Sequence, residues 1–79
     1  MGAAERQSLA DALDMAAGRL ADGVDRRIVD ESIRTAIAAQ PTSRHWASAF
    51  STIIQNANAP EIATYSTNLR RIANELRRQ

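Results

Sequence analysis

The sequence predicts an all-α protein, a compact antiparallel bundle of four short helices at about residues 4–21, 26–39, 43–56 and 59–77. Three observations favour this fold class. Apolar residues recur at steps of three and four along each of these stretches, so they gather on one face of a helix. No stretch alternates apolar and polar residues as a half-buried strand does. The connections are short, which favours side-by-side packing of consecutive helices in a single domain covering residues 1–79.

The first helix, over residues 4–21, carries its apolar residues on one face. These residues are Leu9, Leu13, Ala16 and Leu20. The dipeptide Asp22-Gly23 then ends the helix, because glycine readily adopts the left-handed backbone conformation that follows many helices. We expect the apolar face to join the core of the bundle.

The second helix, over residues 26–39, begins after Asp25, whose side chain is suited to cap the free N–H groups of the first turn. Its apolar face is formed by Val29, Ile33, Ala36 and Ile37, with Ile28 at the edge. Opposite charges stand four residues apart on its outer face: Arg26 with Asp30, Arg27 with Glu31, and Asp30 with Arg34. Such pairs stabilise a solvated helix by about 0.3–0.5 kcal/mol each. Pro41 ends the helix, because the residue before a proline is disfavoured in the α conformation.

The third helix, over residues 43–56, begins at a capping residue, Thr42 or Ser43. Its apolar face is formed by Trp46, Ala47, Phe50, Ile53, Ile54 and Ala57. Its other face is small and polar, with Ser48, Ser51, Thr52 and Gln55. No formally charged residue occurs from His45 to Pro60. Because water-facing helices normally carry charge, the polar face either packs under another helix of this chain or binds a partner.

The fourth helix, over residues 59–77, opens with Asn58 as its N-cap and Glu61 three residues later, a variant of the capping box. Its apolar residues follow heptad spacing: Ile62, Tyr65, Leu69, Ile72 and Leu76. We expect this seam to pack inside the domain, and a homo-oligomer joined through the last helix is the alternative. The residues that we assign to the core are Trp46, Phe50, Ile54, Ile62, Leu69 and Ile72.

Arginine supplies all ten basic residues, against nine acidic residues, so the net charge is +1. This balance does not by itself indicate a polyanionic partner. An arginine-rich composition without lysine is typical of a GC-rich genome, such as that of a bacterium or one of its phages. Four arginines lie on the last helix: Arg70, Arg71, Arg77 and Arg78. They either complement the helix dipole or form a basic strip that contacts phosphate, RNA or an acidic protein surface.

Several function classes lack the residues that their chemistry needs. The chain has no cysteine, and His45 is its only histidine, so the monomer offers neither a catalytic dyad nor an imidazole-based or thiolate-based metal site. We therefore expect no catalytic, metal-binding or cofactor-binding site, and hence no enzyme. No apolar run is long enough to cross a membrane, and charges near the start argue against a signal peptide. We expect a soluble, cytoplasmic protein that does not associate with membranes.

The leading hypothesis is a small protein–protein interaction module, either an adaptor or recruitment domain or a protein of the inhibitor, immunity or antitoxin type. The contacts expected with the protein partner are Ser48, Ser51, Gln55, Arg70, Arg71 and Arg77. The alternative is a helix-turn-helix-type DNA-binding or nucleic-acid-associated regulator, which uses the second and third helices and the basic last helix. In that alternative the nucleic acid contacts the start of the third helix, at Ser43, Arg44 and His45.

Overall fold

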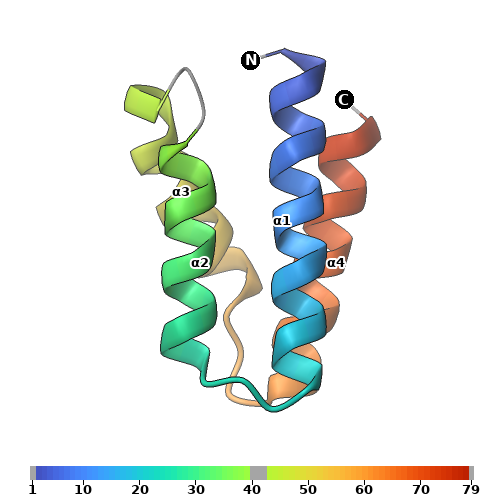
Figure 1. Cartoon of the computed structure of the whole chain (residues 1–79). Coiled ribbons are helices and arrows are strands. Elements are labelled where there is room, and N and C mark those ends of the chain that lie inside the picture. The colour runs from blue at the N-terminus through green and yellow to red at the C-terminus, as the bar shows by residue number, and fades with distance from the viewer. Residues whose placement is uncertain (1, 40–42, 79) are drawn as a thin grey trace.

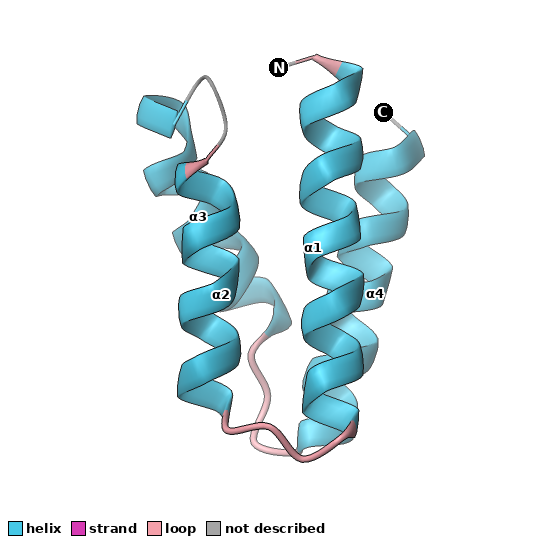
Figure 2. Ribbon diagram, viewed as in Figure 1, coloured by secondary structure: helices cyan, strands magenta, loops and turns pink. Residues whose placement is uncertain are grey.

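The computed structural model describes residues 2–39 and 43–78, with the side chains of residues 43–47, 49 and 50 left out of the description. In these residues it contains helices and no strand, as Figure 1 and Figure 2 show. The helices are α1 (Ala3–Ala21), α2 (Arg26–Ala38), α3 (Ser43–Ala57) and α4 (Ile62–Arg78). The predicted all-α bundle is therefore confirmed.

Consecutive helices run in opposite directions, so the start of α1 and the end of α4 lie at the same end of the bundle (Figure 1). α1 packs most extensively against α4 and also contacts α2, while α3 packs against α2 and α4. Each helix thus has two neighbours in a ring. The principal contact of the bundle joins the first helix to the last.

α1 ends in the turn that the sequence predicts. Gly23 has a φ of 89°, the left-handed conformation expected of the residue after a helix. Its N–H donates to the Leu20 carbonyl at 3.1 Å. The Val24 N–H donates to the Arg19 carbonyl at 3.0 Å. This pair of bonds is a Schellman motif, which satisfies carbonyls that the end of a helix leaves free and directs the chain into α2.

α2 begins at the predicted cap and presents the predicted apolar face. The Asp25 carboxylate accepts a hydrogen bond from the Arg27 N–H at 2.8 Å. The buried residues of the helix are Val29, Ile33 and Ile37, with Ala36 half-buried. Ile28 stands at the edge of this face and is 61% exposed. The helix ends at Ala38, close to the predicted end, and Pro41 lies outside the described residues.

Other contacts replace predicted charge pairs on the outer face of α2. Arg34 pairs with Glu31, in i,i+3 spacing, at 3.9 Å. Arg26 and Asp30 do not pair with each other among the described residues, and both contact α4 or the connection before it. Pairs along a solvated helix are weak, so tertiary hydrogen bonds of Arg26 and Asp30 take the place of the pair predicted between these two residues.

α4 begins later than predicted, at Ile62, and Asn58 is not its N-cap. The Tyr65 N–H donates to the Glu61 carbonyl at 3.0 Å, which puts Glu61 at the cap position. The side-chain oxygen of Asn58 accepts instead from Arg26 of α2. A tertiary hydrogen bond therefore uses the group that the capping box needs, and the chain from Asn58 to Glu61 is not helical.

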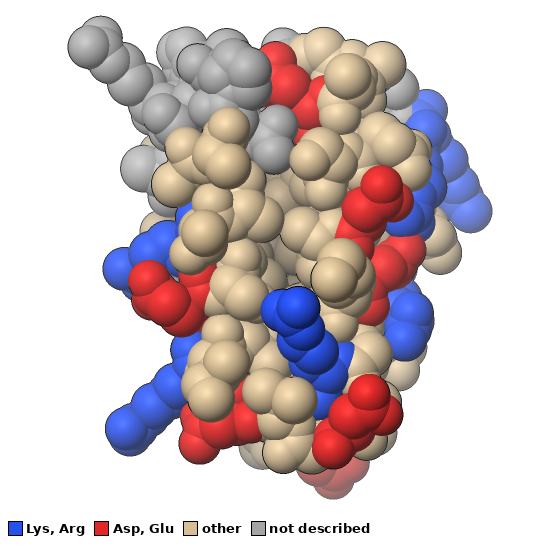
Figure 3. Space-filling view, in the orientation of Figure 1, with Lys and Arg blue, Asp and Glu red and all other residues tan. Residues whose placement is uncertain are grey.

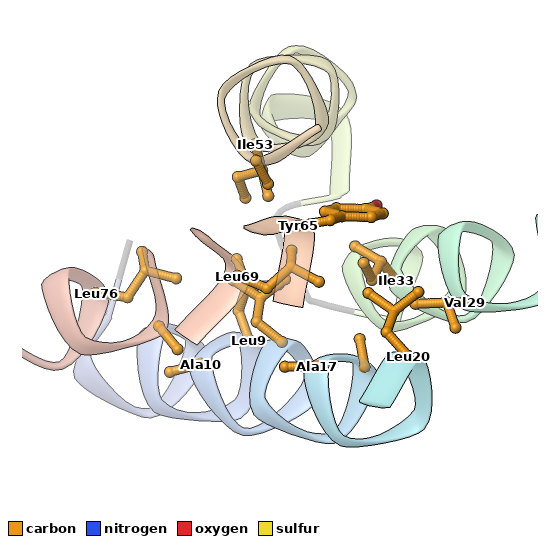
Figure 4. Packing of buried hydrophobic residues seen from close by; sticks show 14 of the residues in the cluster. Leu9, Ala10, Ala17, Leu20, Val29, Ile33, Ile53, Tyr65, Leu69 and Leu76 are labelled. Carbon is orange, nitrogen blue, oxygen red and sulfur yellow. The ribbon is translucent and has the colours of Figure 1, made fainter. Parts of the chain in front are cut away.

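The core is one apolar cluster to which all four helices contribute (Figure 4). Its buried members are Leu9, Ala10, Leu13, Ala16, Ala17, Leu20, Val29, Ile33, Ile37, Ile53, Ala57, Tyr65, Leu69, Ala73 and Leu76. The predicted face of the first helix is entirely among them. Leu69 is buried as predicted, and Ile54 and Ile72 are partly buried against the cluster. The side chains of Trp46 and Phe50 lie outside the described residues.

Ile62 was predicted in the core, and this prediction is wrong, because its side chain is 37% exposed. It is the first residue of α4, at the end of the bundle. Two small residues of α4, Ser66 and Ala73, are buried instead. The Ser66 hydroxyl donates to the Ala17 carbonyl of α1 at 3.0 Å. Small side chains at this seam allow α1 and α4 to approach closely, and the buried hydroxyl has its partner.

Candidate partner-binding surface

The small polar side of α3 is exposed. We call it the α3 face and define it as Ser48, Ser51, Thr52 and Gln55, all of which are exposed. Helix spacing places it opposite Ile53 and Ala57, which are buried. These polar side chains therefore do not pack under another helix of this chain, which was one of the two arrangements that the sequence left open.

The chemistry of the α3 face is unusual for the surface of a helix. Its exposed side chains are hydroxyls and an amide, which cost less to remove from water than an ion does. Depletion of charge is characteristic of the central part of protein–protein interfaces. The α3 face is therefore suited to being covered by another protein.

The four arginines of the last helix do not form one strip. Arg77 is held against α1, where its Nη2 atom lies 2.9 Å from Asp11 Oδ1 and 2.6 Å from Asp14 Oδ2. The hydrogen bond to Asp11, followed by the bond to Asp14, raises the pKa of Arg77 above its ordinary value. The sequence predicted a partner contact at Arg77, and the structure shows a guanidinium that already binds two carboxylates of its own chain.

The remaining arginines of α4 fall on two sides of the helix. Arg70 precedes Arg77 by two turns, and its Nη2 atom is 4.0 Å from the position that a β-carbon on Gly18 of α1 would occupy. Arg71 and Arg78, also two turns apart, are exposed. They make no hydrogen bond or ion pair with another described residue. One pair of arginines therefore faces α1, and the other pair faces solvent.

A polar cluster that the sequence reasoning missed joins α2 to α4. Tyr65 is fully buried, and its hydroxyl donates to Asp30 Oδ1 at 2.5 Å. The guanidinium of Arg26 lies over the ring, 4.8 Å from its centroid, and donates to the side chain of Asn58 and to the Pro60 carbonyl. Burial, and then the hydrogen bond to Asp30, raises the pKa of Tyr65 well above its ordinary value. The phenol therefore stays protonated, and the cluster serves packing.

The side of the molecule formed by α1 and α2 carries interspersed charges around an uncharged strip between these helices (Figure 3). Two large apolar side chains of these helices are exposed, Met15 at 59% and Ile28 at 61%. Single exposed apolar residues are common on protein surfaces and do not define a site. Among the residues that Figure 3 colours by charge, no broad area of one sign appears on this side.

The alternative hypothesis predicted that nucleic acid contacts Ser43, Arg44 and His45. The side chains of these three residues are outside the described part of the structure. Among the described side chains, no three histidine, aspartate or glutamate residues gather closely enough to hold a metal ion. No helix in the described ranges has the length and apolar character needed to cross a bilayer. No protein-family model matches the sequence, and comparison with curated proteins and with solved structures finds no significant similarity.

Proposed function

We propose that this chain is a small protein–protein interaction module of the cytoplasm, which acts by docking to another protein rather than by catalysis. The observation that carries the proposal is the exposed and uncharged α3 face. Both kinds of module suggested by the sequence, an adaptor or recruitment domain and an inhibitor, immunity or antitoxin protein, act in this way.

The packing of the bundle supports this proposal. Ile53 and Ala57, on the opposite side of α3, contribute to the core, so the bundle does not need the α3 face for its own burial. A surface helix gains solubility from charged residues, yet the four exposed positions of the α3 face carry none. The packing of the bundle does not account for this uncharged surface, whereas a docking function does.

Adding charge to the α3 face tests the proposal. We expect the tagged chain to capture a defined protein from a lysate of the source organism, in the presence of nuclease and at about 1 M salt, where the Debye length is about 3 Å. The double substitution Ser48→Glu and Gln55→Glu should abolish this capture. Both side chains are exposed, so the thermal unfolding transition should stay close to that of the parent chain.

The matched control adds the same charge elsewhere on the surface. Ala4→Glu with Ala38→Glu places two carboxylates at exposed positions of α1 and α2, and this variant should still capture the same protein. Equal loss of capture in both double variants would contradict the proposal, because the loss would then follow net charge and not the α3 face.

A nucleic-acid-binding regulator would give the opposite pattern. Capture would vanish with nuclease, and log K for duplex DNA would fall by about 0.9 for each phosphate neutralised as log salt rises. Arg44→Ala together with His45→Ala would then relax the preference for one DNA sequence. That pattern, without a retained protein, would replace the docking proposal with the helix-turn-helix-type alternative.

A further inference from the structure

The connection between α3 and α4 contains two candidate starts for α4. Glu61 occupies the N-cap position in the structure, although glutamate is not among the residues preferred there. Asn58, which is of a preferred type, stands three residues earlier at the spacing of a capping box with Glu61. Pro60 would fall within the first turn of the longer helix, where proline is tolerated. The structure therefore uses the start with the poorer cap.

Both groups of Asn58 that a capping box uses are engaged elsewhere. Its side-chain oxygen accepts a hydrogen bond from Nη2 of Arg26, the first residue of α2. Its backbone N–H donates to the Ile54 carbonyl of α3 at 2.8 Å. In a capping box the same oxygen would accept from the Glu61 N–H, and the same N–H would donate to the Glu61 carboxylate. The two arrangements therefore exclude each other.

Arg26 holds the connection at a second point. Its Nη1 atom donates to the Pro60 carbonyl at 3.4 Å. Its guanidinium lies 4.8 Å from the centroid of the Tyr65 ring, which is buried and joined to α2 through the hydrogen bond to Asp30. The start of α2 and the connection lie at the same end of the bundle (Figure 1). One side chain of α2 thus ties the connection to α2 through both Asn58 and Pro60.

A longer α4 is incompatible with the present place of α3. Residues 58–61 connect the two helices, which end and begin at Ala57 and Ile62. A start at Ala59 would leave Asn58 alone between them, whereas antiparallel neighbouring helices are joined by about two to five residues. The end of α3 would have to unwind or move. Ala57 would then lose its burial and the hydrogen bond that its carbonyl accepts from Asn68 Nδ2 at 2.9 Å.

We propose that Arg26 is a strap that selects the start of α4, and that its release lengthens α4 to Ala59 and frees the end of α3 from the bundle. The strapped arrangement is the one in the structure. It is also favoured by Ala59, because a residue before proline is disfavoured in the α conformation. In the released arrangement Asn58 caps α4, while the seam between α1 and α4, with its hydrogen bond from Ser66 to Ala17, persists. The proposal goes beyond the docking function and does not depend on it.

Arg26→Ala removes the strap and tests the proposal by nuclear magnetic resonance on the intact chain. The Cα chemical shifts of Ala59 and Glu61 should move toward helical values. Amide hydrogen exchange at Ala57 should become about tenfold or more faster relative to exchange at Leu69, because α3 opens locally while the seam between α1 and α4 stays closed. A circular dichroism melt establishes that the variant is folded.

A double variant separates the change of cap from simple loosening. Arg26→Ala with Asn58→Ala lacks both the strap and the better cap, so the Cα shifts of Ala59 and Glu61 should return to non-helical values. Arg27→Ala is the matched control, because it truncates the exposed arginine next to Arg26 on α2. Its relative exchange rate at Ala57 should stay within about twofold of the parent.

Arg26→Lys provides a second, milder release. Lysine keeps a cation near the Tyr65 ring but has one nitrogen in place of the two that hold Asn58 and Pro60. It should therefore move the same signals in the same direction by a smaller amount. This variant tests the strap if Arg26→Ala does not fold.

Several results would overturn the proposal. Unchanged Cα shifts at Ala59 and Glu61 in a folded Arg26 variant would refute the second start of α4. Helical shifts that persist in the double variant would refute Asn58 as the cap. An equal rise in exchange at Ala57 and Leu69 would mean that Arg26 supports the whole bundle and does not hold α3 selectively. Loss of a cooperative melt in both Arg26 variants would also contradict the proposal, which requires the seam between α1 and α4 to persist.

Discussion

The two sides of α4 contain similar residues with different roles. On the side facing α1, Ser66 donates to a backbone carbonyl and Arg77 binds two aspartates. On the outward side, Thr67 and Arg78 are exposed. Arg77 and Arg78 are adjacent in sequence but point about 100° apart around the helix. The comparison shows that residue type alone does not determine which arginines of α4 bind other groups of the chain. The helix that lies next to each side of α4 determines it.

The largest expected effect on stability comes from truncating a side chain on the buried side of α4. Leu69 is fully buried, so Leu69→Ala should lower the free energy of unfolding by about 2–5 kcal/mol through lost burial and a residual cavity. In a domain this small such a loss removes much of the total stability. Urea denaturation followed by circular dichroism measures it.

Ile28→Ala is the control for this substitution, because the Ile28 side chain is 61% exposed. Its effect should stay within about 0.5 kcal/mol. Similar losses for the two variants would mean that the buried and exposed sides of the bundle are not distinct in the way described.

Tyr65→Phe should have the next largest effect, because it removes the hydroxyl that joins α4 to Asp30 of α2. A hydrogen bond to a charged group contributes about 1.5–3 kcal/mol, and the variant should lose stability in this range at neutral pH. An unchanged denaturation midpoint would contradict the described hydrogen bond.

The same hydroxyl predicts how stability depends on pH. Folding raises the pKa of Tyr65 above its ordinary value of 10.0, so the folded state holds the phenolic proton more tightly than the unfolded state does. This stabilisation is complete below about pH 10 and is lost as the pH rises through the pKa of the folded state. The free energy of unfolding of the parent chain should fall above pH 10 more steeply than that of Tyr65→Phe. Parallel profiles would contradict the raised pKa.

A small effect on the melting temperature is expected from substituting the two adjacent arginines of α4. The difference between the two substitutions tests most directly whether the two sides of α4 have different roles. Arg77→Ala should lower the melting temperature slightly, because Asp11 and Asp14 lose their partner. The difference should shrink at high salt, which screens exposed ion pairs. Arg78→Ala should leave the melting temperature unchanged, because Arg78 makes no hydrogen bond or ion pair with another described residue. An equal thermal effect of the two substitutions would remove the distinction between the two sides.

No effect is expected from dilution. The seam on the last helix that the sequence offered for a homo-oligomer is largely used within the chain, since Tyr65, Leu69 and Leu76 are buried. The melting temperature should therefore stay constant over about a hundredfold dilution. A melting temperature that falls with dilution would support the alternative, a homo-oligomer joined through the last helix.

Local patterns accounted for most of the fold. Apolar residues that recur three and four positions apart predicted the four helices. Gly23 marked the end of a helix and Asp25 the start of the next, because these roles depend only on neighbouring residues. The start of α4 was wrong because Asn58 binds Arg26, which is 32 residues away in the chain. No local pattern reports such a contact.

The surface was predicted less completely, for a related reason. Helix spacing and composition predicted which residues form the α3 face but left open whether it packs under another helix, and the structure shows that it is exposed. The division of the arginines was not predicted, because it depends on which helix lies on each side of α4. Tyr65 gave the one available signal for the missed polar cluster, since a tyrosine in an apolar seam needs a partner for its hydroxyl. The identity of that partner, Asp30, required the tertiary structure.

The principal helix contact joins α1 to α4, and this has a consequence for synthesis on the ribosome. Until α4 has emerged, the apolar face of α1 lacks the neighbour that covers most of it. α2 and α3 can form as helices at that stage, but only α2 packs onto α1, and this leaves the seam with Ala17 open. The bundle is therefore expected to fold in one step once α4 has been made. The α3 face is not carried on a stable bundle until the chain from α1 to α4 is present.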